Sequence, residues 1–219
     1  MKEWITKYLF YSRLSRSNEA KKLADFAPKL GSKYAMDWDD YHDHDTLNDF
    51  IAALADANEW ASIIPIGESY EGRKMNVLAI TKAGPGAPNI WIEAGIHARE
   101  WISPAVASFI IRELVEDYAE HPSYIDNINW YYLPSGNDHS LDIDNSSSFS
   151  ANPDGYEYSI NQDRYWRKNR APNSGSSCYG TDLNRNWGFL KLLLFMFLIL
   201  GTGASTNYFC LIFVLICLF

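Results

Sequence analysis

The chain contains few cysteines, and no two of them have the spacing of a cysteine zinc site. Only three of its 219 residues are cysteine: Cys178, Cys210 and Cys217. Because none of them forms a C-x-x-C pair, zinc bound by cysteines is disfavoured. The odd count leaves at least one thiol without a partner within the chain. Cysteine use alone does not define the compartment.

The chain also lacks an excess of positive charge and a recognisable leader. Its formal net charge is -8, which argues against nucleic acid as a partner, because phosphate binding needs a concentrated basic patch. Residues 1–10 include Lys2, Glu3 and Lys7, and they contain no apolar run of the length that a signal peptide needs. We therefore expect either a cytosolic protein or a chain whose true start is missing.

The C-terminal tail lacks charge in a different way. Leu192 to Phe219 forms a run of 28 uncharged residues, interrupted at its middle by the small and polar residues Gly201 to Asn207. One interpretation is a membrane anchor, because the run is long enough to span a bilayer. The other is translation through a retained intron, because Phe, Leu and Ile have T-rich codons. Residues 135–149, a polar loop-like segment, are a second candidate for a retained insert.

Between these regions, hydrophobic periodicity predicts alternating strands and helices. Thr46 is expected to cap a helix of about three turns, and Ser103 with Pro104 to begin a second helix. The expected buried stripe of that second helix is Val106, Ile110, Leu114 and Tyr118. Strands are expected over Ala61–Ile66, Met75–Thr81, Asn89–Ile96 and Asn129–Leu133, the first two as a hairpin. The predicted class is α/β with a mixed sheet.

The residues with the clearest potential for chemistry follow the third of these strands. His97 and Glu100 lie three positions apart, between the strand and the helix. Imidazole and carboxylate are both zinc ligands, and α/β folds place their sites at the carboxyl ends of strands. The spacing alone is weak evidence, because a surface histidine beside a solvated glutamate gives the same pattern. Two protein ligands also leave a catalytic zinc site incomplete.

Four motifs that occur in order add specificity to this pair. They are GIHAREWISPA at 95–105, NPDGYEYS at 152–159, RYWRKNR at 164–170 and GTDLNRNWGF at 180–189. Together they resemble the zinc metallocarboxypeptidase family of the pancreatic A/B type, over residues 36–189. Residues 1–35 resemble the remnant of that family's activation peptide, whereas residues 135–149 and 190–219 do not fit its pattern. The resemblance implies a mixed, twisted sheet with helices on both faces, incomplete at the C-terminus.

The resemblance also implies a function and roles for individual residues. It implies a secreted zymogen whose active form removes single C-terminal residues from peptides, acts on peptide or protein C-termini and is a monomer. His97 and Glu100 would bind Zn²⁺, and Asp182 would orient His97. Arg167 would stabilise the oxyanion of the transition state. Asn184 and Arg185 would bind the free C-terminal carboxylate of the substrate, and Arg99 would also be a substrate-binding residue.

The family's pattern continues into a second half that this sequence does not match. That half supplies a third zinc ligand, a histidine, and the glutamate that acts as general base; it also supplies the pocket residue that separates A-type from B-type preference. It contains the expected disulfide partner of Cys178 as well. After Phe189 the chain contains no His, Asp, Glu or Arg. We therefore expect this chain to be a truncated and inactive form, with an extracellular location implied by the family and membrane anchorage as the lesser alternative.

Other interpretations remain open at this stage. A non-catalytic protein that binds peptide C-termini would need only Arg167, Asn184 and Arg185, and a third possibility is a chain that does not fold stably. Arg167, Lys168 and Arg170 could form a solvated basic face, and Asp182 could simply cap a turn. His42 and His44 have no supporting motif and are interpreted as surface or packing residues. His121, before a proline in a loop, and His139, in the atypical insertion, are not expected to be ligands.

Overall fold

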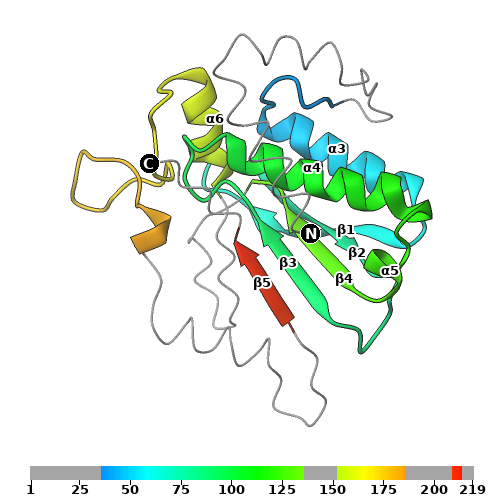
Figure 1. The fold of residues 1–219 in the computed structure, drawn as a ribbon. Coiled ribbons are helices and arrows are strands. Elements are labelled where there is room, and N and C mark those ends of the chain that lie inside the picture. The colour runs from blue at the N-terminus through cyan, green and yellow to red at the C-terminus, as the bar shows by residue number, and fades with distance from the viewer. Residues whose placement is uncertain (1–35, 136–151, 186–208, 214–219) are drawn as a thin grey trace. The chain divides into compact units, whose positions relative to one another are not determined.

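The fold is organised around a mixed sheet that carries its long helices on one face (Figure 1). The computed structural model describes residues 36–135 and 152–185, together with the backbone of residues 209–213. Five strands pair in the order β1-β2-β4-β3-β5. The pairs β1–β2 and β2–β4 are antiparallel, whereas β4–β3 and β3–β5 are parallel. The predicted α/β class with a mixed sheet is confirmed.

The first two strands form the predicted hairpin. β1 spans Ala61–Glu68 and β2 spans Lys74–Ile80, and their register is shifted between Pro65 and Gly67. β4, at Asn129–Leu133, has the predicted bounds. Burial alternates in the first part of β1, whereas β2 and β4 are short apolar runs that are buried on both faces of the sheet.

The strand that leads to His97 ends earlier than predicted. β3 spans Asn89–Glu93, whereas the alternation of apolar residues predicted a strand that continues to Ile96. Gly95 adopts a φ of 76°, a left-handed conformation that turns the chain out of the sheet. The apolar alternation in the sequence continues past the end of β3 because Ala94 and Ile96 are still buried, although they no longer pair with a neighbouring strand.

The first long helix begins two residues before the predicted cap. α3 spans His44–Ala57, and its N-cap is Asp43, whose side chain accepts a hydrogen bond from the Thr46 backbone N–H at 2.8 Å. Thr46 is thus the donor to the cap and not the cap itself. Both residue types favour this position, so the sequence left the choice open by a few residues.

The second long helix presents a different face to the core than predicted. α4 spans Ile102–Glu116 and is preceded by Trp101, which makes no side-chain capping bond. Ser103, predicted as the cap, instead accepts a hydrogen bond from Gly95 N–H at 3.2 Å. Val106 is buried as predicted, but Ile110, Leu114 and Tyr118 are only partly buried. The buried face of α4 consists of Ser103, Pro104, Val106, Ala107, Ser108, Ile111, Arg112 and Val115.

Two apolar clusters lie on opposite faces of the sheet. The larger contains α3 and α4 residues packed on Leu78, Ile92 and Tyr132, and the smaller consists of Met75, Val77, Trp91 and Leu133. Adjacent strand residues such as Tyr132 and Leu133 fall into different clusters, as pleating requires. All described helix residues that belong to either cluster are in the larger cluster, so the helices cover one face of the sheet.

Short elements complete the described chain. They are η1 (Asp117–Ala119), α5 (Ser123–Asp126), α6 (Pro153–Asn161), η2 (Leu183–Arg185) and β5 (Phe209–Phe213). β5 lies in the uncharged tail and forms an edge of the sheet beside β3. Within the described ranges, no helix has the length and apolar character of a membrane span. The predicted activation-peptide remnant, most of the 135–149 insert and most of the tail lie outside the described residues.

Candidate functional site

His97 and Glu100 lie together where the chain leaves β3, as the sequence predicts. Their side chains approach each other, with His97 Nδ1 2.9 Å from Glu100 Oε1. His97 is almost fully buried, whereas Glu100 retains some exposure. The turn after Gly95 creates this proximity, because it carries His97 out of the ladder and directs the next residues towards α4.

Asp182 approaches the same histidine from the other side. Its Oδ1 lies 3.4 Å from His97 Nε2, and its Oδ2 accepts a hydrogen bond from Arg167 Nε at 2.9 Å. Nε2 has no well-aligned hydrogen bond within the described residues, so Asp182 is the carboxylate that it faces. Arg167 Nη1 also lies 3.6 Å from Glu100 Oε1. Four residues from three separate segments therefore meet at one point.

The charges around Asp182 favour its ionised form. Partial burial raises the pKa of this carboxyl, but the hydrogen bond and positive charge of Arg167, with a smaller effect of His97, outweigh it. The net result is a pKa below the ordinary value for aspartate. Asp182 is thus held as a carboxylate, which can accept a hydrogen bond from a protonated imidazole nitrogen.

The residues expected to bind a substrate carboxylate lie close in sequence to His97, Glu100 and Asp182. Asn184 and Arg185 belong to η2, directly after Asp182, and the Arg185 side chain is exposed. Asp182 Oδ1 also accepts a hydrogen bond from Asn184 N–H at 3.1 Å. Asp182 therefore caps a turn and faces His97 at once, so the two interpretations of this residue are compatible. Arg99 is exposed between His97 and Glu100.

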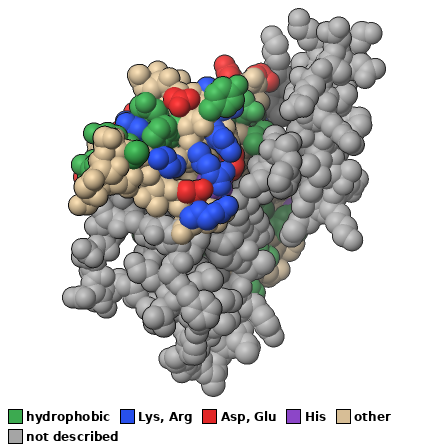
Figure 2. Space-filling model, turned by 90° about the vertical axis from the view of Figure 1, so that its left-hand side faces the viewer, with side chains coloured by type: hydrophobic (Ala, Val, Ile, Leu, Met, Phe, Trp, Pro, Cys, Tyr) green, Lys and Arg blue, Asp and Glu red, His purple; other side chains and the backbone are tan. Residues whose placement is uncertain are grey.

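The interpretation of Arg167, Lys168 and Arg170 as a solvated basic face is wrong for two of these three cations. Arg167 is ion-paired with Asp182, and the Arg170 guanidinium lies 3.8 Å from the centre of the Tyr158 ring. Nevertheless, Lys and Arg side chains gather on one face of the molecule, with Asp and Glu among them (Figure 2).

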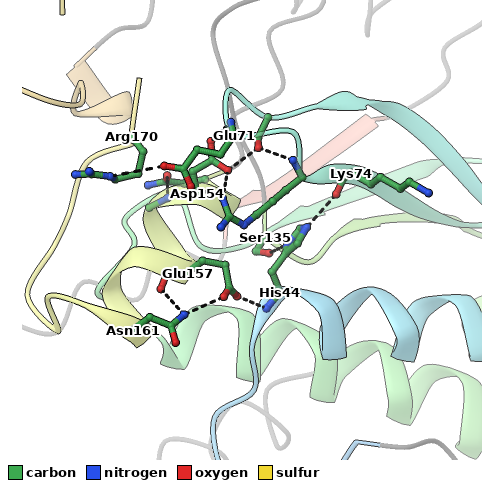
Figure 3. Close-up of polar contacts among 12 residues, drawn as sticks. His44, Glu71, Lys74, Ser135, Asp154, Glu157, Asn161 and Arg170 are labelled. Carbon is green, nitrogen blue, oxygen red and sulfur yellow. Dashed lines mark hydrogen bonds and ion pairs between the residues drawn. The ribbon is translucent and has the colours of Figure 1, made fainter. Parts of the chain in front are cut away.

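A partly buried polar network anchors α6 (Figure 3). Asp154, almost fully buried, accepts hydrogen bonds from Ser69 Oγ at 2.5 Å and from Arg73 Nη1 at 2.7 Å. Glu157 accepts a hydrogen bond from His44 N–H at 2.7 Å. Through these contacts the turn between β1 and β2 and the start of α3 both hold α6.

His44 belongs to the same region and has a structural role. Its Nδ1 lies 2.7 Å from Ser135 Oγ and its Nε2 lies 2.9 Å from the Lys74 carbonyl, as Figure 3 shows. A carbonyl can only accept, so Nε2 carries the proton and Nδ1 accepts from the serine hydroxyl. The interpretation of His44 as a packing residue is therefore confirmed. His121 is exposed, and His139 lies outside the described residues.

Three residues of the quoted motifs have contacts that the sequence did not predict. Asn152 is fully buried and bonds to the backbone on both sides of the site. Asn169 Oδ1 accepts a hydrogen bond from Thr181 N–H at 2.7 Å, next to Asp182. Arg164 donates to the Arg99 carbonyl at 2.8 Å. Membership in the motifs was the only signal, because their contacts join segments distant in sequence.

The donor set is compatible with a zinc ion. Tetrahedral zinc with ligands at 2.0–2.2 Å separates two ligand atoms by about 3.4 Å, and His97 Nδ1 and Glu100 Oε1 already lie 2.9 Å apart. Asp182 faces the other imidazole nitrogen, where metal-binding histidines commonly meet a carboxylate. No group of three or more His, Cys, Asp or Glu side chains arranged to hold a metal is found within residues 36–135 and 152–185.

Comparison with known proteins identifies the family. The profile of the zinc carboxypeptidase family, Peptidase_M14, matches residues 47–138 and 148–206. Carboxypeptidase B of Astacus astacus is 42% identical over 157 residues, which are 70% of this chain and 46% of the relative. Carboxypeptidase A1 of Bos taurus is 39% identical over 154 residues, or 69% of this chain and 34% of the relative. The chain belongs to the zinc carboxypeptidase family.

Solved structures agree with this assignment. The crystal structure of thrombin activatable fibrinolysis inhibitor superposes with a TM-score of 0.59 at 31% identity, over 69% of this chain and 35% of that one. Carboxypeptidase A from Helicoverpa armigera gives a TM-score of 0.59 at 28% identity, over 84% and 47% of the two chains. The chain thus spans about a third to a half of the length of the relatives that it matches.

Proposed function

We propose that this chain carries part of the active site of a zinc-dependent exopeptidase that removes single C-terminal residues from peptides. The observation that supports this proposal most strongly is the convergence of His97, Glu100, Asp182 and Arg167 at the end of β3 in a member of the zinc carboxypeptidase family. His97 Nδ1 and Glu100 would hold Zn²⁺, with Asp182 fixing the orientation of His97. When bound, zinc supplies a Lewis acid and a water of lowered pKa.

Arg167 would stabilise negative charge on the scissile carbonyl. Its Nε donates to Asp182 and its Nη1 lies 3.6 Å from Glu100 Oε1, so these contacts fix one edge of the guanidinium and leave Nη2 for a substrate oxygen. A donor held in place before the reaction stabilises a developing oxyanion without a reorganisation cost. The same ion pair would prevent Arg167 from swinging towards solvent.

Arg185, Asn184 and Arg99 would bind the free C-terminal carboxylate of the substrate. Arg185 is exposed at the end of η2, and a guanidinium can bind a carboxylate through two parallel hydrogen bonds. Arg99 is exposed next to His97. A carboxylate clamp beside the zinc ligands would select the last peptide bond of a chain and would make the reaction exopeptidic.

A complete catalytic site needs a third ligand and a general base in addition to these residues. The described residues bring neither to His97 and Glu100. We therefore expect the 219-residue chain to bind zinc weakly and to hydrolyse peptides poorly. The same observation supports the alternative of a protein that binds peptide C-termini without cleaving them. An extracellular location, a monomeric state and an activation peptide within residues 1–35 belong to the same proposal.

Zinc content, peptide binding and turnover distinguish these functions when measured on one preparation. The probe is a short peptide with a free C-terminus, and the control is the same peptide with an amidated C-terminus. The exopeptidase proposal predicts zinc bound through His97 and Glu100, with a preference for the free acid. Peptide binding without zinc or turnover would instead support the non-catalytic alternative. Equal binding of both peptides would contradict the carboxylate clamp.

A further inference from the structure

Asn152 lies at the junction of the segments that carry the reactive side chains. It is the N-cap of α6, and it is fully buried. Its Nδ2 donates to the Ile96 carbonyl at 3.1 Å and to the Lys168 carbonyl at 3.2 Å, and it lies 3.5 Å from the Arg167 carbonyl. Its Oδ1 accepts a hydrogen bond from Gly155 N–H at 3.0 Å. One side chain therefore joins three pieces of backbone.

Two of these pieces of backbone lie at a proposed functional residue: one immediately precedes His97, and the other contains Arg167. Ile96 is followed by His97, and the other carbonyls belong to Arg167 and its neighbour Lys168. The backbone forms a direct link at the same place, since Ala98 N–H donates to the Arg167 carbonyl at 3.2 Å. One peptide hydrogen bond, and the Asn152 amide beside it, thus join the backbones next to His97 and Arg167.

The backbone segments around this amide approach one another closely. A Cβ placed on Gly155 would lie 2.3 Å from the Lys168 carbonyl oxygen and 2.4 Å from Asn152 Oδ1. A Cβ on Gly180, two residues before Asp182, would lie 2.1 Å from the Asn169 carbonyl oxygen. Glycines on two sides thus let the 152–155, 167–169 and 180–182 segments approach at backbone distance.

We propose that Asn152 is a positioning residue that fixes the spacing between His97 and Arg167, a role that rests on the proposed zinc site. Without its amide, the buried Ile96 and Lys168 carbonyls would lose this donor, and fewer contacts would hold the two segments at their present distance. Displacements of about 1 Å are enough to weaken a catalytic arrangement by about 100-fold. The contribution of Asn152 is therefore to geometry, because the amide bonds to backbone on both sides of the site and to neither reactive side chain.

The test separates this role from helix capping. Asn152→Ser retains a side chain that caps α6 well but is too short to bridge the carbonyls. Asn152→Asp retains the shape and the cap but replaces the donor by an acceptor. The matched control is Ser159→Ala: Ser159 is also buried on α6 and donates to the Ala98 carbonyl at 3.0 Å, but it has no described bond to residues 167–168. Hydrogen exchange of the Ala98 amide and Zn²⁺ affinity are measured on the full chain.

We expect both Asn152 variants to exchange the Ala98 amide about tenfold faster or more, with unchanged protection in β3, and to bind zinc about 10- to 100-fold more weakly. Ser159→Ala should retain Ala98 protection. Native Ala98 protection and zinc affinity in Asn152→Ser would overturn the proposal, and so would equal loss of protection in β3, which would indicate a general folding role. If the unaltered chain binds no zinc, the proposed function fails, whereas the exchange of Ala98 still decides the positioning role.

Discussion

Asp182 connects two parts of the proposed chemistry at the level of single side chains. One of its oxygens faces His97 Nε2 and the other accepts from Arg167 Nε. The carboxylate therefore orients a proposed zinc ligand and an oxyanion donor together. Because Arg167 holds the pKa of Asp182 below its ordinary value against the effect of burial, the group is ionised at neutral pH.

Replacement of Asp182 by asparagine should weaken zinc binding by about 10- to 100-fold, the usual effect of removing a carboxylate behind a histidine ligand. The amide is of similar size but cannot offer two anionic oxygens to His97 and Arg167. Affinity is measured by competition with a chromogenic chelator, and Asp39→Asn, at an exposed carboxylate, is the control. Wild-type affinity in the Asp182 variant would argue against an interaction of this carboxylate with a metal-bound His97.

His44 should make the stability of the fold sensitive to acid. Burial lowers the pKa of its imidazole. The hydrogen bond to the Lys74 carbonyl and the carboxylates of Glu157 and Asp45 raise this pKa, but the effect of burial is larger. The unfolded chain therefore takes up this proton at a higher pH than the folded chain does. The contribution of His44 to stability is complete above about pH 6.5 and is lost as pH falls, by at most about 1.4 kcal/mol per pH unit.

Urea unfolding at several pH values between 4 and 7.5 measures this dependence. The His44→Gln variant should have lower stability at neutral pH but a flatter dependence on acid. His121→Gln, at an exposed histidine, should keep the slope of the unaltered chain. An unchanged slope in His44→Gln would mean that other groups take up the proton.

Residue types and motifs predicted which side chains would meet, but they did not predict how. His97, Glu100, Arg167 and Asp182 were all assigned to one site, and the structure brings them together. The ion pair between Arg167 and Asp182 was not predicted, nor was the role of Asn152. Both depend on the packing of distant segments, for which periodicity carries no signal.

At the scale of elements, α6 supports the site although it contributes none of the proposed ligands. Its first residues contact the backbone at Lys168, and Asp154 ties it to the turn between β1 and β2. Ser159 on its last turns donates to the Ala98 carbonyl. The helix is only nine residues long, so these contacts and not helix propensity hold it in place.

Gly155→Ala should destabilise the protein even though alanine is the better helix former. Propensity alone would favour alanine by about 1 kcal/mol, but the new Cβ would lie 2.3 Å from the Lys168 carbonyl oxygen. We expect a net loss of about 1–3 kcal/mol, as in overpacked cores. Chemical denaturation measures it, and Asn161→Ala, an exposed position on the same helix, should change stability by less than about 0.5 kcal/mol. A stabilised Gly155→Ala protein would refute the close approach.

Element positions followed from the sequence more reliably than element faces. The hairpin and β4 were located because short runs rich in apolar and aromatic residues are bounded there by turn and loop residues. The face of α4 was mispredicted because apolar residues occur almost all around it, so that the stripe through Ile110 and Leu114 was as regular as the buried one through Ala107 and Ile111. The end of β3 was missed because the left-handed conformation of Gly95 leaves the burial pattern intact.

At the scale of the whole molecule, the sheet and the family assignment place the site at the carboxyl end of a parallel strand. β3 lies between β4 and β5, and both neighbours run parallel to it. The chain spans about a third to a half of its relatives' length. The described residues include two proposed zinc ligands, a carboxylate proposed to orient one of them and cations proposed to bind an anion, so zinc recognition can be tested directly.

Zinc titration of the 219-residue chain and of three histidine or glutamate variants tests the central claim most directly. The account predicts one zinc ion per chain, with affinity lost in His97→Ala and in Glu100→Ala but retained in His121→Ala, at an exposed histidine. Extended X-ray absorption of the zinc-loaded chain should show imidazole nitrogen and carboxylate oxygen at 2.0–2.2 Å. Zinc binding that is unchanged in His97→Ala, or zinc coordinated without imidazole, would contradict the account.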